Sequence, residues 1–162
     1  MAEHENGASA PEQPPARLQI ITQFIRDLSF ENIGVQKGGV PDGKPEVKVA
    51  INLDAANRGS DQYDVALKLK VDSHVQGIPL FILEIDYAGR FVIQGVPQEQ
   101  MHPLLMIECP RLIFPFLRRL VSDITRDGGY PPLNLEMIDF MTLYRQEVAK
   151  RQAEATPKTA NA

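Results

Sequence analysis

The segment from Leu80 to Val96, LFILEIDYAGRFVIQGV, constrains the fold more than any other part of the chain. Its odd-numbered positions are apolar or glycine, whereas its even-numbered positions include two acids, an arginine and a glutamine. Side chains alternate between faces in a strand, so this pattern predicts one strand with a buried face and a wetter face. A tight hairpin at Ala88-Gly89 would move Arg90 onto the apolar face. The strand is therefore predicted to run unbroken, with Gly89 as a bulge or a close-approach site.

Two earlier segments alternate in the same way and predict two more strands. Apolar residues occupy every second position from Val47 to Leu53, and again from Tyr63 to Val75 except at Ser73. The turn residues at 57–61 and 76–79 leave only short connections, which favour antiparallel neighbours.

The first apolar segment, from Leu18 to Glu31, fits either a helix or a strand by spacing alone. As a strand it places five residues on one side, and its β-branched and aromatic content favours this interpretation. Those residues are Leu18, Ile20, Phe24, Leu28 and Phe30. Residues 33–45 are rich in glycine and proline and are predicted to form a loop. The result is a four-stranded antiparallel meander.

The C-terminal half changes to a helical period. Residues 98–108 predict a short helix that ends near Pro110, and residues 111–126 predict a long helix with two apolar stripes. A last helix is predicted from about Met137 to Ala153. Strands followed by helices indicate an α+β fold. We divide the chain into a disordered N-terminal arm (1–16), one domain (17–153) and a flexible C-terminal tail (154–162).

The broad apolar face of the long helix predicts a homo-oligomer. One stripe can cover the sheet, but the second stripe then needs a partner, and twofold symmetry is the commonest arrangement.

Charge and composition exclude several classes of protein. The net charge is −4 and the chain has no cluster of Lys and Arg, which argues against nucleic acid as a partner. No apolar run approaches the roughly 20 residues that span a bilayer, and the N-terminus lacks the features of a secretory signal. The single cysteine, Cys109, suits a reducing compartment. These features predict a soluble cytoplasmic protein that is not inserted in the membrane.

The sequence has no set of residues whose spacing is typical of an active site or a metal site, so we predict no enzyme activity, cofactor or metal. The three histidines are widely spaced, and a single cysteine cannot complete a zinc pattern. Cys109 with His102 could be a nucleophile and base, but a lone cysteine is more often a small buried residue. Glu84 and Asp86 share the wetter strand face, which favours a solvated acidic surface over a catalytic pair.

Several apolar residues near loops and element ends have two interpretations. They either belong to the core or form a groove for extended polypeptide, in which apolar walls take side chains and sheet edges offer backbone partners. The residues include Phe24, Phe30, Tyr130, Leu133, Leu135 and Phe140.

Four sequence blocks resemble the SecB protein-export chaperones. They are RDLSFE at 26–31, LFILEIDYAGRF at 80–91, CPRLIFPFLR at 109–118 and GYPPLNL at 129–135. The blocks occur in order at suitable spacing, and the resemblance covers about residues 18–150. The N-terminal arm is Pro/Ala-rich and the C-terminal tail carries few acids.

The resemblance implies an ATP-independent cytosolic chaperone that works as a dimer of dimers. It would hold unfolded precursor proteins and deliver them to the SecA translocation ATPase. A SecB-like chaperone dedicated to a toxin–antitoxin system is the alternative, and acids retained at 27, 31 and 84 favour the SecA-linked role.

The resemblance also implies roles for particular residues. The acidic face that receives SecA falls on Asp27, Glu31 and Glu84, with Asp86 as a looser addition. The groove for unfolded clients is assigned to Phe24, Val47, Val49, Tyr130, Leu133, Leu135 and Phe140. The oligomer interface is assigned to Phe81, Leu83, Ile85, Tyr87, Leu112, Phe116 and Leu120.

Overall fold

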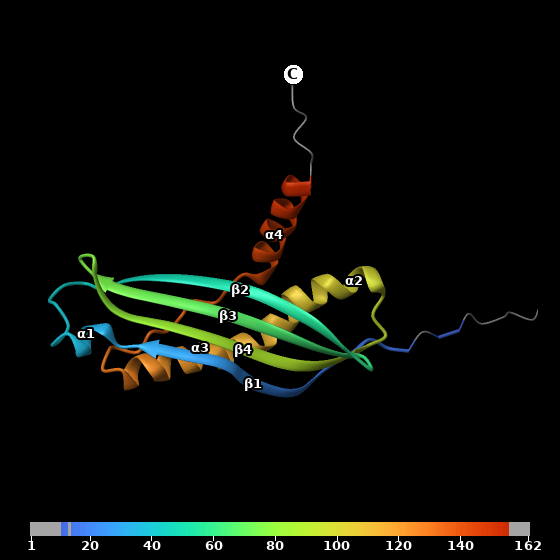
Figure 1. Ribbon diagram of the computed structural model, residues 1–162. Helices are drawn as coiled ribbons and strands as arrows, with labels where there is room; N and C mark the ends of the chain where they lie inside the picture. The colour runs from blue at the N-terminus through green and yellow to red at the C-terminus, as the bar shows by residue number, and fades with distance from the viewer. Residues whose placement is uncertain (1–10, 13, 156–162) are drawn as a thin grey trace, which may run out of the picture.

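Four long strands form one antiparallel sheet, and a long helix lies along one of its faces (Figure 1). The computed structural model describes residues 11, 12 and 14–155. The predicted arm and tail therefore lie largely outside the described residues. In chain order the elements are β1 (Arg17–Glu31), α1 (Ile33–Gln36), β2 (Glu46–Gly59), β3 (Gln62–Val75), β4 (Ile78–Gln94), α2 (Gln98–Pro103), the π-helical turn η1 (Leu104–Glu108), α3 (Cys109–Asp127) and α4 (Phe140–Ala155).

The antiparallel sheet is confirmed, but its strand order differs from a simple meander. The order is β1-β4-β3-β2. Strands β2, β3 and β4 follow one another through short turns, whereas β1 lies beside β4 and is joined to β2 by a segment that crosses the end of the sheet. This is a Greek-key order. It leaves β1 and β2 as the two edges.

Strand β4 runs unbroken, as its alternation predicts. Its odd-numbered side chains from Phe81 to Ile93 are buried. Gly89 is a close-approach site, because a Cβ there would lie 2.9 Å from the Phe91 ring and 3.0 Å from Ile113 of α3. The helix therefore packs tightly over this point of the strand.

The segment 17–31 is a strand, but two bulges change which side chains share a face. The pairing of β1 with β4 shifts between Ile20 and Thr22 and again between Ile25 and Asp27. Between the bulges Phe24 is opposite Ala88 and lies on the face away from α3, unlike Leu18 and Phe30. The prediction that Phe24 shares their face is wrong, because each bulge inserts one residue and so reverses the alternation.

The predicted helix end near Pro110 is also wrong. Helix α2, the turn η1 and helix α3 follow one another without a gap from Gln98 to Asp127. Pro110 lies in the first turn of α3, directly after the π-helical turn. A proline ring conflicts with the regular hydrogen bond between residues i and i+4 of a helix. The π-helical turn departs from that pattern just before Pro110, so the helical run continues.

The two apolar stripes of α3 have different environments. Ile113, Leu117 and Val121 are fully buried against the sheet. Leu112 and Phe116 on the second stripe remain 43% and 44% exposed. The prediction of a broad apolar face with one stripe left open is confirmed for the single chain.

The last helix begins at Phe140, later than predicted, because Asp139 caps it. The Asp139 side chain accepts hydrogen bonds from the Thr142 backbone N–H and hydroxyl, at 3.0 and 2.8 Å. Phe140 is buried edge-on against Phe114. From this anchor α4 projects away from the sheet (Figure 1) and continues to Ala155, two residues into the predicted tail.

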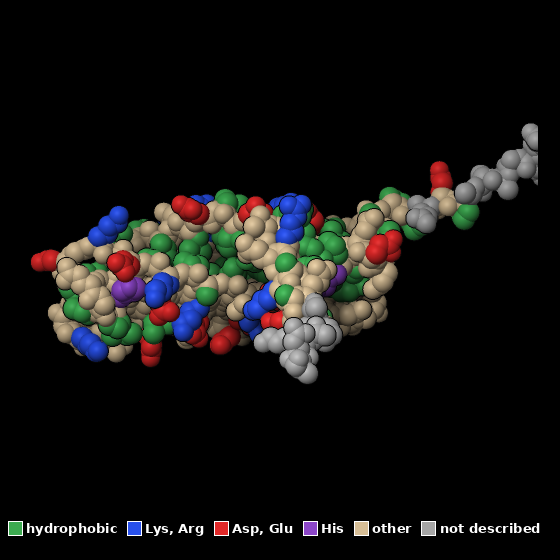
Figure 2. Space-filling view, turned by 90° about the horizontal axis from the view of Figure 1, so that it is seen from above, with side chains coloured by type: hydrophobic (Ala, Val, Ile, Leu, Met, Phe, Trp, Pro, Cys, Tyr) green, Lys and Arg blue, Asp and Glu red, His purple; other side chains and the backbone are tan. Residues whose placement is uncertain are grey.

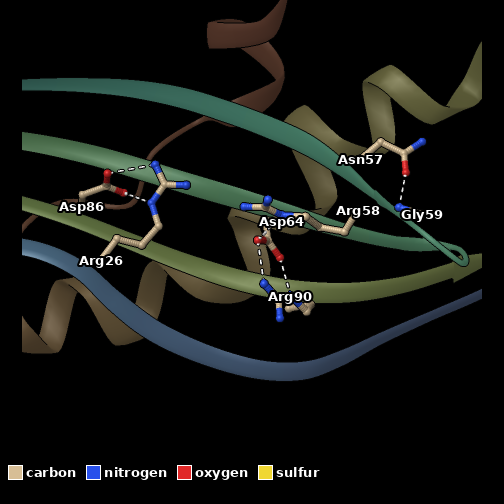
Figure 3. Close-up of polar contacts among 7 residues, drawn as sticks. All are labelled: Arg26, Asn57, Arg58, Gly59, Asp64, Asp86 and Arg90. Carbon is tan, nitrogen blue, oxygen red and sulfur yellow. Dashed lines mark hydrogen bonds and ion pairs between the residues drawn. The ribbon is translucent and has the colours of Figure 1, made fainter.

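A buried carboxylate links three strands on the face away from α3 (Figure 3). Asp64 of β3 accepts two hydrogen bonds from Arg90 of β4, at 2.7 and 3.0 Å, and one from Arg58 of β2, at 2.8 Å. The Arg90 guanidinium also lies over the Phe24 ring of β1, at 5.9 Å from its centroid. The hydrogen bonds from Arg90, and then the one from Arg58, hold the pKa of Asp64 below its usual range despite burial.

Replacing Asp64→Asn should lower the free energy of unfolding by about 1–3 kcal/mol at pH 7, because two arginines lose a buried ionic acceptor. The folded-state pKa of Asp64 is depressed, so this stabilisation is present above the unfolded-state pKa of about 3.9 and is lost as the pH falls through the lower folded-state value. Urea unfolding at pH 7 and at stepwise lower pH measures both effects. Asp72→Asn, at a half-exposed carboxylate on the same strand, is the matched control. An equal loss in both variants would contradict the assignment.

Candidate functional site

The four predicted acidic residues lie together on the sheet face away from α3. In the register of the sheet, Asp27 of β1 is opposite Asp86 of β4, and Ser29 is opposite Glu84. Glu31 follows at the end of β1 and is exposed. Two adjacent strands therefore bring all four carboxylates together. Their positions in the sequence alone could not establish this proximity.

One of the four carboxylates is neutralised within the chain (Figure 3). Arg26 donates two hydrogen bonds to Asp86, at 3.1 and 2.9 Å. Like charges directly opposite one another in a sheet repel, so Asp27 and Asp86 would destabilise the pair of strands without this cation. The β1 bulge inserts Arg26 beside them and offsets the repulsion.

The other three carboxylates differ in whether a cation of the chain lies close to them. Asp27 and Glu31 make no ion pair with any residue between 14 and 155. Glu84 is 55% exposed and lies 3.6 Å from Lys70 of β3. Lys68 and Lys70 also border a shallow depression of about 370 Å³ with Asp27, Glu84 and Asp86. The face therefore combines free acids with interspersed lysines.

The opposite, helix-facing side of edge strand β2 carries an apolar stripe. We call Val47, Val49, Ile51, Leu53 and Ala55 the β2 stripe; these odd-numbered residues are opposite buried residues of β3. Val47 and Val49 are 40% and 47% exposed. Because β2 is a sheet edge, its outer backbone groups have no strand partner in the described chain.

A cleft of about 280 Å³ continues from this stripe toward α4. Ile51 and Leu53 line one wall, Leu143 and Tyr144 of α4 line another, and Met106 of η1 contributes as well. A second hollow of about 440 Å³ shares Leu53, Met106 and His102 with it. Figure 2, seen from the side toward which α4 points, shows hydrophobic side chains gathered in a hollow between the sheet and the helix layer. The cleft has apolar walls beside an open strand edge.

The residues predicted to line a client groove fall into three environments. Val47 and Val49 are exposed on the β2 stripe. Tyr130, Leu135 and Phe140 are buried at 8%, 6% and 1% exposure, so in this structure they are core residues rather than open walls. Leu133 packs at the margin of the core, and Phe24 lies on the other face of the sheet.

The residues predicted to form the oligomer interface divide in a similar way. Phe81, Leu83, Ile85 and Tyr87 are buried beneath the chain's own helix layer, and none is more than 8% exposed. In the single chain the helix layer covers these four side chains, and their place in an oligomer interface stays a prediction. Leu112 and Phe116 remain open, and Leu120 is partly buried.

The candidate nucleophile and base do not form a catalytic pair. Cys109 is fully buried, and burial followed by the charge of Glu108 raises its pKa to about 12. His102 instead lies 3.3 Å from the Tyr144 hydroxyl, with the two rings 5.5 Å apart. Among residues 11, 12 and 14–155, no group of three or more His, Cys, Asp and Glu side chains is placed to hold a metal ion. No helix in these ranges is both long and apolar enough to cross a bilayer.

Sequence reasoning missed part of the cleft. The helical spacing of Leu143, Tyr144 and Val148, which puts them on one side of α4, was the available signal for this wall. Met106 gave no such signal, because the π-helical turn that directs it toward the cleft was not predicted.

The class that this fold defines is a four-stranded α+β domain with two open sheet edges and a helix layer on one face. Comparisons with known proteins identify the class. A family model described as preprotein translocase subunit SecB matches residues 10–151. The chain belongs to the SecB family.

Curated relatives and a solved structure agree with this assignment. The protein-export protein SecB of Ruegeria pomeroyi is 57% identical over 93% of this chain and 94% of its own length. That of Roseobacter denitrificans is 56% identical over 98% of both chains. The SecB-like chaperone of Mycobacterium tuberculosis, solved with an antitoxin peptide, has a TM-score of 0.64 and 15% identity over 75% of this chain and 91% of its own, which shows a shared fold.

Proposed function

We propose that this protein is an ATP-independent cytoplasmic chaperone that holds unfolded precursor proteins for export and delivers them to the SecA translocation ATPase. The observation that carries the proposal is the open backbone edge of β2 beside an apolar stripe and cleft. An extended chain can hydrogen-bond to such an edge while its side chains bury apolar area. Area burial at roughly 25 cal/mol per Å² does not depend on side-chain identity, which suits a binder of many sequences.

The close relatives favour the export role over the toxin–antitoxin alternative. Relatives that match nearly the whole chain at 50–57% identity are named protein-export proteins. The chaperone solved with an antitoxin peptide shares only the fold with this chain.

The holding activity is tested by refolding a chemically unfolded secretory precursor, with and without a stoichiometric amount of the protein and without nucleotide. We expect slower refolding and a client that stays soluble. Val49→Asp should weaken this effect by placing a charge on the β2 stripe. Ile78→Asp, at a similarly exposed aliphatic residue at the start of β4, is the matched control. Unchanged refolding with the wild-type protein would refute the holding role.

The acidic face provides the site for SecA. Asp27, Glu31 and Glu84 are the carboxylates not held in close hydrogen bonds, whereas Asp86 is occupied by Arg26. Exposed ionic contacts are screened and individually weak, so they allow fast binding and release. This face is on the opposite side of the sheet from the β2 stripe, so a client and SecA can be bound at the same time.

Glu84→Lys should weaken binding to SecA by about three- to tenfold at low salt, mainly through slower association. Client holding should change little, because the β2 stripe lies on the other face. Surface plasmon resonance at two salt concentrations and the refolding assay measure the two activities. Glu46→Lys, at an exposed acid that begins β2, is the control for charge. An equal loss of both activities would contradict the separation of the two surfaces.

The protein is further proposed to be a homotetramer built as a dimer of dimers. The exposed stripe of α3, with Leu112 and Phe116, and the β1 edge, with Ile25 and Leu28, carry apolar side chains that the single chain leaves uncovered. Two different self-complementary contacts are what a dimer of dimers requires. A tetramer would also present several client clefts at once, which raises avidity through effective concentration.

Replacing Leu112→Glu and Phe116→Glu together should reduce the mass from tetramer toward dimer, because the interface would bury two carboxylates without partners. Multi-angle light scattering measures the mass, and circular dichroism should show an unchanged fold, since both positions are exposed in the single chain. Ile78→Glu, at a similarly exposed position at the start of β4, is the control. A tetramer in the double variant would exclude the α3 stripe as the contact.

A further inference from the structure

Two segments that are far apart in the sequence are hydrogen-bonded to each other at one end of the sheet. The Tyr130 hydroxyl, after α3, lies 2.5 Å from Oδ1 of Asn32, which directly follows β1. Nδ2 of Asn32 donates to the Gly128 carbonyl at 2.8 Å. One amide side chain therefore binds the segment after α3 at two points. We call Asn32 and Tyr130 the latch.

The Tyr130 hydroxyl has one proton but two acceptors within hydrogen-bonding distance. The Tyr130 hydroxyl also lies 3.0 Å from the carbonyl oxygen of Leu80 in β4. Leu80 falls where the register of β4 with β3 shifts, and it has no paired residue on either neighbouring strand. The donation from Nδ2 to Gly128 fixes Oδ1 of Asn32 as an acceptor, so the single hydroxyl proton is shared between Asn32 and the sheet. Burial raises the pKa of Tyr130, which keeps the hydroxyl a donor.

Apolar packing holds the Tyr130 ring in place independently of its hydroxyl. The ring contacts Phe81 with centroids 4.9 Å apart, and Phe81 contacts Phe30 at 5.5 Å. Gly34 of α1 makes room for the hydroxyl, since a Cβ at that position would lie 3.1 Å from it. Removing only the hydroxyl therefore leaves the aromatic packing intact, and the latch can be tested apart from the core.

The latched segments carry the two walls of the candidate client site. The segment 32–45 leads into β2 and its exposed Val47 and Val49. The segment 128–139 passes behind the sheet to α4 (Figure 1), whose Leu143 and Tyr144 line the cleft. The latter segment is otherwise tied to α3 by Leu133 N–H donating to Thr125 and by Arg118 donating to the Leu135 carbonyl. Within residues 14–155, the side-chain hydrogen bonds between the two wall segments are those of the latch.

We propose that Asn32 and Tyr130 are positioning residues for client binding, setting how readily the two wall segments separate to admit and release an extended polypeptide. The proposal rests on the proposed holding function. A closed latch restricts the segment 128–139 and so slows both entry and exit of a client. Loosening it exposes apolar surface more often, so association and dissociation both become faster. The binding constant then changes less than either rate does, because the groups that touch the client are unchanged.

The test uses Tyr130→Phe, which keeps the ring and removes the donor. The probe is a fluorescently labelled secretory precursor whose reduced cysteines have been alkylated so that it stays unfolded. Stopped-flow binding to the full-length protein should show both rate constants raised by about three- to tenfold, with the dissociation constant changed by less than about threefold. Tyr63→Phe is the matched control, because no hydrogen bond of the Tyr63 hydroxyl is found within residues 14–155. Its rates should equal those of the wild type.

Two further measurements separate a latch from a general loss of stability. Hydrogen exchange without client should be faster in 128–139 of Tyr130→Phe and unchanged in β3. The double variant Asn32→Ala with Tyr130→Phe should not be additive. Its change in activation free energy, calculated from the rate constants, should be smaller than the sum of the changes in the two single variants, since both remove the same contact. Additive effects, or faster dissociation with unchanged association, would overturn the proposal. If the wild-type protein binds no client while exchange in 128–139 still responds to Tyr130→Phe, the holding function fails and the hydrogen-bonded latch remains.

Discussion

The packing of α3 onto the sheet is the interaction on which the rest of the structure depends. The helix places Ile113, Leu117 and Val121 on the apolar face of β3 and β4, and Gly89 lets it approach the strand closely. Burying a large aliphatic side chain contributes about 1.5–3 kcal/mol, so this contact supplies much of the driving force for folding. A single helix is narrower than four strands. The contact therefore covers the central strands and leaves both edges with exposed apolar side chains.

That incomplete coverage explains why the candidate sites lie where they do. A sheet whose edges were covered as well would offer no free backbone groups to an extended polypeptide, and a sheet with no apolar cover would not be stable. The β2 stripe and the β1 edge are what remains after α3 has been placed centrally. On the other face, the buried Asp64 cluster joins β2, β3 and β4 without apolar cover. That face is consequently free to carry charges, and those charges do not compete with the apolar side for the same partner.

Regular alternation made much of the fold predictable, and local irregularities limited the rest. The unbroken course of β4 and the two stripes of α3 follow from side-chain periodicity, which is a local property. Phe24 was placed on the wrong face because bulges have no clear sequence signal, yet each one reverses the alternation. The place of β1 beside β4 could not be derived from connection lengths, since the segment 32–45 is long enough to reach either edge. The burial of Tyr130 likewise depends on Phe81 and Asn32, which only the folded chain brings near it.

The sequence also does not show which charged side chains are paired in the folded chain, and this pairing affects function directly. Asp27, Glu84 and Asp86 look equivalent in the sequence, as acids on one strand face or beside it. In the structure Arg26 occupies Asp86, Lys70 approaches Glu84, and Asp27 has no partner among the described residues. A basic partner meeting this face gains most from the unpaired acid and must displace an internal cation to use Asp86. The electrostatic preference of the surface is therefore set by which acids the fold leaves unpaired, and strand register and bulges determine that selection.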